Sequence, residues 1–83
     1  MTAAQSNEDL LRRVFSEALG LPSEMITDTL TYGEADNWDS IAHMALVAAM
    51  DAEFGTMLEM DDILDMSSFG KAKEILAKYG IGF

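Results

Sequence analysis

The side chains with the clearest chemical potential stand close together in the segment NWDSIAHM, which contains Asp39, Ser40 and His43. Residues three positions apart on a helix face the same side, so the His43 imidazole would lie near the Ser40 hydroxyl. A serine hydrolase also needs a group that orients the imidazole and an oxyanion hole beside the serine. Asp39 directly precedes Ser40, where it suits a helix cap better, and the chain has no G-x-S-x-G elbow. We therefore expect no hydrolase here.

A second candidate is the acidic segment EMDDILD, in which Glu59, Asp61, Asp62 and Asp65 could gather around a cation. An EF-hand loop needs acids at alternate positions, a central glycine and a terminal glutamate. This segment lacks that order. Solvated charges near the ends of a short helix are the favoured interpretation, and we expect no metal site.

Two side chains beside Ser40 each allow two interpretations. His43 is either an exposed or half-buried helix residue, which is the commoner case, or it acts beside whatever Ser40 carries. Trp38 either anchors the preceding loop to the core or presents an aromatic edge to a partner. We favour the anchor.

The first predicted helix spans 7–19, where apolar residues recur at helical spacing after a cap at Ser6 or Asn7. A glycine and a proline end it. The connection over 20–39 is long for a compact domain, and we expect it to be ordered, with a helical turn near 23–26. Its apolar residues should fasten it to the core: Leu21, Met25, Ile26, Leu30, Tyr32 and Trp38.

The second predicted helix spans 40–54, with Asp39 as its N-cap and Gly55 as its end. Its core stripe should consist of Ile41, Met44, Val47, Met50 and Phe54, with Leu46 beside it. The methionines on that stripe are interpreted as packing residues. Three others border the next helix and could line an adjustable apolar cleft, namely Met57, Met60 and Met66.

A short third helix is predicted at 61–66, and Ser67 or Ser68 should cap a fourth helix. One face of that helix should carry Phe69, Ala72, Leu76 and Tyr79, and the tail GIGF should be frayed. The expected fold is all-α: a small four-helix bundle with a long loop between helices 1 and 2 and a short helix 3. Residues 1–83 should form one domain, with its core over about 7–79.

The composition indicates a small protein without covalent staples. The chain has 83 residues, no cysteine and a formal net charge of −10. It therefore has neither a disulfide nor a thiol nucleophile of its own. Nothing resembles a signal peptide or a membrane span, so we expect a cytoplasmic monomer.

The charge is unevenly distributed along the chain. Between Arg13 and Lys71 there are 12 acidic residues and no lysine or arginine. Such a field repels nucleic acid and anionic lipid, and it attracts basic protein surfaces. We expect a basic protein partner and no binding to nucleic acid or membrane, although acidity also simply favours solubility.

The triplet DSI at the predicted start of the second helix resembles the attachment motif of the acyl carrier protein family, in which Asp-Ser-Leu opens that helix. The likeness extends over about residues 8–79. The Leu-Gly end of the first helix, the long loop, the EFG end of the second, DDILDM and SSF all fall in the family's order.

The resemblance implies that 4'-phosphopantetheine is attached to Ser40 by a phosphopantetheinyl transferase, which takes it from coenzyme A and supplies its own magnesium. The chain would then be a substrate of other enzymes and no enzyme itself. The arm would supply the thiol that this sequence lacks, and an exposed serine at a positive helix end suits a phosphodiester. Partners would be a loading enzyme and synthase enzymes with basic docking surfaces.

The segment also differs from fatty-acid carriers. Asn37 stands where a glycine is common, and Ala42, His43 and Ala45 replace acids usual in the first turns of the helix. The interpretation is a discrete carrier of a specialised pathway (polyketide, nonribosomal peptide or modified fatty acid). Open alternatives are an aminoacyl or peptidyl carrier and an unmodified acidic interaction module. The candidate partner-recognition residues are Trp38, Ile41, His43, Met44, Asp51 and Glu53.

Overall fold

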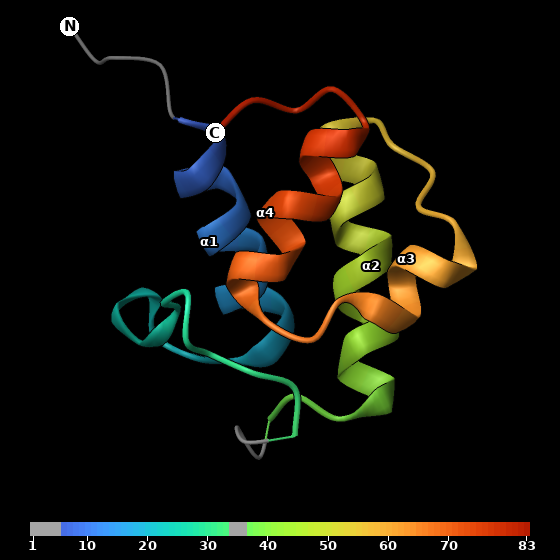
Figure 1. Cartoon of the computed structure of the whole chain (residues 1–83). Helices are drawn as coiled ribbons and strands as arrows, with labels where there is room; N and C mark the ends of the chain where they lie inside the picture. Colours follow the sequence, from blue (N-terminus) through green and yellow to red (C-terminus); the bar gives the residue numbers. More distant parts are fainter. Residues whose placement is uncertain (1–5, 34–36) are drawn as a thin grey trace, which may run out of the picture.

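The computed structural model describes residues 6–33 and 37–83, which form four α-helices and one 3-10 turn (Figure 1). The elements are α1 (Asn7–Leu19), η1 (Ser23–Met25), α2 (Ser40–Phe54), α3 (Met60–Asp65) and α4 (Phe69–Lys78). The described residues contain no strand, only an isolated bridge between Thr31 and Ser68. The predicted all-α fold with a short third helix is confirmed.

Local capping explains where the two long helices begin and end. The Ser6 hydroxyl accepts from the Asp9 N–H at the start of α1, and the Asp39 carboxylate accepts from the Ala42 N–H at the start of α2. Both helices end at a glycine with φ of 67°, a left-handed conformation that a side chain would strain. Both spans agree with prediction, whereas α3 begins and ends one residue earlier than expected.

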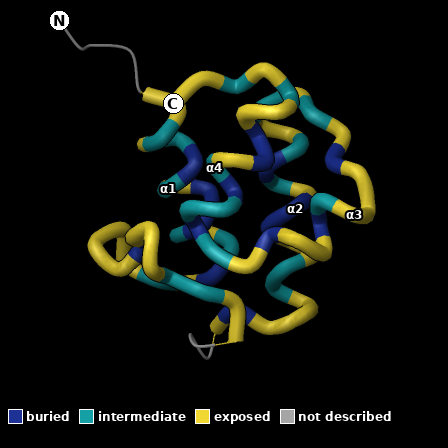
Figure 2. Tube along the Cα trace, in the orientation of Figure 1, coloured by how far each residue is buried: buried dark blue, intermediate teal, exposed yellow. Residues whose placement is uncertain are grey.

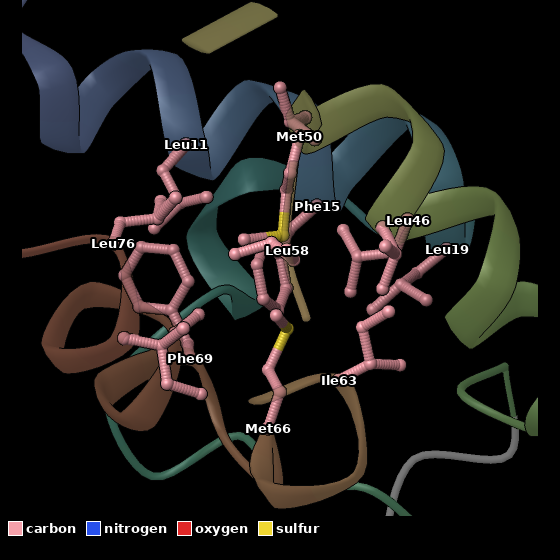
Figure 3. Packing of buried hydrophobic residues seen from close by; sticks show 14 of the residues in the cluster. Leu11, Phe15, Leu19, Leu46, Met50, Leu58, Ile63, Met66, Phe69 and Leu76 are labelled. Atoms are coloured by element: carbon pink, nitrogen blue, oxygen red, sulfur yellow. The ribbon is translucent and has the colours of Figure 1, made fainter. Parts of the chain in front are cut away.

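The core draws on every α-helix and on the loop before α2 (Figure 2). The close-up shows side chains of α1, α2, α3 and α4 meeting around Phe15, Met50 and Met66 (Figure 3). Phe15 makes edge-on contacts with Trp38 and Phe69, at ring-centroid distances of 5.3 and 5.0 Å. These contacts join the loop and α4 to α1.

The predicted core stripe of α2 is wrong at its first two positions. Ile41 is 81% exposed and Met44 is 54% exposed, while Leu46 is fully buried at 0%. The helix is apolar around most of its circumference, so apolar spacing alone does not select the face that packs. The first turn of α2 therefore presents apolar side chains to solvent.

The loop between α1 and α2 is fastened to the molecule as predicted, mainly through Ile26 and Trp38, both of which are buried. Backbone hydrogen bonds also tie its second half to the segment before α4, from the Tyr32 N–H to the Ser67 carbonyl and from the Phe69 N–H to the Leu30 carbonyl. Met25 and Tyr32 are exposed, contrary to expectation. The described parts of the loop, before and after residues 34–36, are thus held against the helices.

The predicted fraying of the tail is wrong. The Ile81 N–H donates to the Leu76 carbonyl, and the Ile81 side chain packs against the core. The Asn7 amide donates to the Gly82 carbonyl at 2.8 Å, which ties the tail to the start of α1. No helix in the described ranges is long and apolar enough to cross a membrane.

Candidate functional site

Ser40 is the first residue of α2 and is exposed. The neighbouring cap holds this turn in place, because the Asp39 Oδ1 accepts from the Ala42 N–H at 2.9 Å and the Asp39 carbonyl accepts from the His43 N–H at 2.8 Å. The Asp39 cap was predicted from sequence and is confirmed. The serine hydroxyl therefore stands at a fixed place on the surface.

The helix start also suits an anionic group attached to Ser40. The backbone N–H groups of Ser40 and Ile41 donate to no acceptor among the described residues, and the first turn of α2 contains no acid beyond its cap. Free N–H groups and the positive end of the helix dipole favour a phosphate diester at such a place. The residues present therefore fit a phosphate-linked group on the serine.

The His43 ring is not available as a base for Ser40, because both of its ring nitrogens have other partners. The Trp38 Nε1–H donates to His43 Nδ1 at 2.9 Å, and His43 Nε2 lies 2.8 Å from the Ile63 carbonyl oxygen. A nitrogen that accepts from Trp38 is unprotonated, so the proton of the neutral ring sits on Nε2 and is donated to Ile63. Neither nitrogen is free to take a proton from Ser40.

Trp38 is only 1% exposed, in agreement with its predicted role as an anchor. Its ring stacks on His43 at an interplanar angle of 26° and meets Tyr32 edge-on at 79°. The alternative in which Trp38 presents an edge to a partner is wrong, since the indole is enclosed by its own chain. Its effect on the site is indirect, through His43 and the loop.

A cavity of about 300 Å3 opens beside Ser40, between α2 and α3. It is lined by Tyr32, Ser40, His43, Met44, Met60, Ile63, Leu64, Met66 and Ser67. The predicted methionine cleft is thus present for Met60 and Met66, whereas Met57 is exposed and is not among the lining residues. Tyr32, Ile63 and Leu64 were not foreseen as site residues.

Two acids of the α3 region, Asp62 and Asp65, form contacts that join α3 to the α4 region. Asp62 accepts hydrogen bonds from Lys78 Nζ at 2.5 Å and from the Tyr79 hydroxyl at 2.7 Å, and these bonds lower the pKa of Asp62. The same carboxylate raises the pKa of Lys78 and of Tyr79. Asp65 lies 3.4 Å from Lys71. No group of metal-ligating side chains occurs within the part of the chain that the structure describes.

The two acids at the far end of α2 also have partners within the chain. Asp51 Oδ1 accepts from the Thr56 hydroxyl at 2.8 Å and from the Leu58 N–H at 3.2 Å, which stabilises the turn after α2. Glu53 forms an ion pair with Arg13 at 2.9 Å. Neither acid is near Ser40 along the helix, so their recognition by a partner stays a prediction.

Comparison with known families agrees with this geometry. The family model described as "Phosphopantetheine attachment site" matches residues 9–76, a span that includes α2 with Ser40 at its start. No curated protein matched the chain closely enough to count as a relative.

Proposed function

The chain belongs to the phosphopantetheine attachment site family, and on that premise we propose that it is a carrier whose Ser40 bears the 4'-phosphopantetheine arm. Domains of this family hold that group covalently and generally act as non-catalytic carriers. The bound arm supplies a thiol for thioester formation, which a chain with no cysteine cannot provide itself. The observation that carries the assignment to Ser40 is its exposure at the capped start of α2, beside the cavity.

The roles of the neighbouring residues follow from their positions. Asp39 holds the first turn, and the N–H groups of Ser40 and Ile41 are available to the phosphate. Both ring nitrogens of His43 are engaged by Trp38 and Ile63, so His43 does not accept a proton from Ser40. Its role is to form part of the cavity wall. A phosphopantetheinyl transferase is the enzyme that loads the arm from coenzyme A.

The cavity favours an apolar acyl cargo over an aminoacyl one. Its walls are mainly methionine, isoleucine and leucine, together with aromatic faces of Tyr32 and His43. Burying a methylene group in such a site stabilises by about 0.8 kcal/mol, whereas an amino acid's ammonium group would lose its hydration there. We therefore place the carrier in an acyl pathway, polyketide or modified fatty acid, with the aminoacyl carrier as the alternative.

Ile41 and Met44 belong to the proposed partner surface, because they are exposed on the first turns of α2 next to Ser40. Solvent-facing apolar side chains on a chain with a net charge of −10 suit a partner with an apolar contact and basic groups around it. His43 would act there through the cavity wall, while Asp51 and Glu53 would meet basic groups at the far end of α2. We propose a cytoplasmic monomer with one domain over 1–83.

Intact-mass spectrometry after incubation with coenzyme A, magnesium and a broad phosphopantetheinyl transferase tests the assignment. We expect a gain equal to one phosphopantetheine in the wild type and in Ser23→Ala, a matched change at another exposed serine. Ser40→Ala should gain nothing. No gain in the wild type would instead favour an unmodified interaction module, and a gain in Ser40→Ala would place the arm elsewhere.

A further inference from the structure

The short helix α3 is held by polar contacts on two sides. Toward α4, Asp62 accepts from Lys78 and Tyr79. Toward α2, the hydrogen bond from His43 to the Ile63 carbonyl is the one polar contact between the two helices among the described residues. That carbonyl belongs to the last turn of a six-residue helix, where carbonyl oxygens have no N–H donor within the helix. His43 therefore supplies a partner that α3 cannot supply itself.

The same histidine lines the cavity beside Ser40. One wall of the cavity comes from α2 through His43 and Met44, and the facing wall comes from α3 through Met60, Ile63 and Leu64. Displacement of α3 from α2 would separate these walls. The bond that joins the two helices is thus placed to decide how far apart these two walls lie.

The contact between His43 and Trp38 depends on the charge of the ring, whereas Nε2–H can donate to the Ile63 carbonyl in both the neutral and the protonated ring. The indole N–H of Trp38 can only donate, so His43 Nδ1 must be unprotonated for that 2.9 Å contact to exist. A protonated ring would carry a hydrogen on Nδ1 that points at the indole hydrogen. The ring would have to turn away from Trp38 to relieve this clash, and that turn would take Nε2 away from the Ile63 carbonyl. Because Trp38 is buried, its N–H would then lack a partner within the core, which is costly.

We propose that His43, the Trp38 N–H and the Ile63 carbonyl form a latch that holds α3 against α2 beside the cavity, and that protonation of His43 releases it. The inference concerns regulation of the proposed acyl site, but the latch itself does not require Ser40 to be modified. The neutral ring holds the latch, and acidification that protonates the ring releases it.

The groups that face the His43 ring do not themselves account for a pH dependence, so the charge of His43 would be its cause. From the loop these are the Trp38 indole and the Tyr32 ring, at centroid distances of 6.0 and 5.4 Å, and from α3 the Ile63 carbonyl. Neither ring carries charge between pH 5 and 8. No acidic or basic side chain among the described residues has a hydrogen bond or ion pair with His43.

The chain is well suited to a test by NMR, since it contains one histidine and one tryptophan. On the unmodified protein, the Trp38 indole N–H signal should move with the same midpoint as the His43 ring signals between pH 8 and 5. Over that range, the Ile63 amide should lose protection against hydrogen exchange by roughly two- to tenfold after correction for its intrinsic rate. The amides of α1 serve as the internal reference and should keep their protection.

Two variants separate the latch from general loosening. His43→Gln can still donate to the Ile63 carbonyl but places nothing at Nδ1, so α3 protection should no longer depend on pH. Tyr79→Phe removes a bond to Asp62 on the other side of α3, so it should lower protection while keeping the pH response. Unchanged Ile63 protection in the wild type, or an equal pH response in His43→Gln, would overturn the latch.

The link to cargo is tested separately, on acyl-loaded protein. The thioester should be cleaved by hydroxylamine faster in His43→Asn than in the wild type at pH 8, because asparagine is too short to reach Ile63. Equal rates would refute control of the cargo by the latch. Failure of loading itself would count against the proposed function, and the NMR result on the unmodified chain would stand apart from it.

Discussion

Ser40 and His43 illustrate at the residue scale how neighbours of reactive type can have separate tasks. They are three positions apart, as a nucleophile and a base would be, yet the imidazole is committed to Trp38 and Ile63. The sequence indicated the Asp39 cap correctly, and the role of Ser40 stays a prediction. The sequence did not reveal the partners of His43, because Ile63 is 20 residues away in sequence and meets His43 only through the packing of α3.

A first prediction distinguishes the contribution of the Asp39 capping hydrogen bond to stability from that of its negative charge. Asp39→Ala should cost about 1 kcal/mol by removing the bond to the Ala42 N–H, which lowers the melting temperature by roughly 4–8 °C for a domain of this size. Asp39→Asn can keep that bond and should melt near the wild type. Melting is followed by circular dichroism. An equal loss in both variants would contradict the capping role.

At the scale of elements, caps and glycines made the spans of α1 and α2 predictable, because they are local signals. The face of α2 that packs against the core could not be predicted in the same way. Ile41, Met44 and Leu46 are all apolar, and only tertiary contacts determine which of them is buried. The cavity was equally hidden, because its walls come from the loop, α2, α3 and the segment before α4. The docked tail depends on Asn7, which is 75 residues from Gly82.

The two faces of α2 can be compared by matched truncations. Leu46→Ala should destabilise by about 2–5 kcal/mol, because it opens a cavity in the core. Ile41→Ala should change the free energy of unfolding by no more than about 0.5 kcal/mol, since its side chain is 81% exposed. Urea unfolding measures both. A large loss for Ile41→Ala would show that this side chain packs after all.

The contact between α3 and α4 predicts a pH dependence. Hydrogen bonds from Lys78 and Tyr79 lower the pKa of Asp62, so its contribution to stability is present above about pH 4, the ordinary range of a carboxyl, and is lost as pH falls through the lowered value. Asp62→Asn should therefore be less stable than the wild type at pH 7, and the difference should narrow toward pH 2.5. Urea unfolding at both pH values gives the two differences, and a constant difference would contradict the linkage.

On the scale of the whole molecule, the chain combines strong acidity with an apolar cavity beside the proposed attachment residue, Ser40. From the net charge of −10 we expect weak binding to nucleic acid and anionic surfaces and faster encounter with basic proteins. Tethering then presents cargo to each partner at high effective concentration, without a need for tight binding. Charge and tether together suit brief, repeated contacts.

Cargo burial should be visible in the stability of the whole protein. If an acyl chain enters the cavity, burial of two or three methylenes stabilises by about 2 kcal/mol, and each kcal/mol raises the melting temperature by roughly 4–8 °C. Octanoyl-loaded protein should thus melt several degrees above the form with a free thiol, and an acetyl-loaded control should not. Scanning calorimetry compares the three. Equal melting temperatures would favour a cargo that stays outside, as an aminoacyl group would.

The bond between Asn7 and Gly82 has a consequence for how this unit can be joined to others. It brings the start of α1 and the end of the chain together at one pole of the bundle, whereas α2 begins at the opposite pole (Figure 1). A neighbouring module, a purification tag or a solid support joined after Phe83 would therefore be attached at the pole away from Ser40.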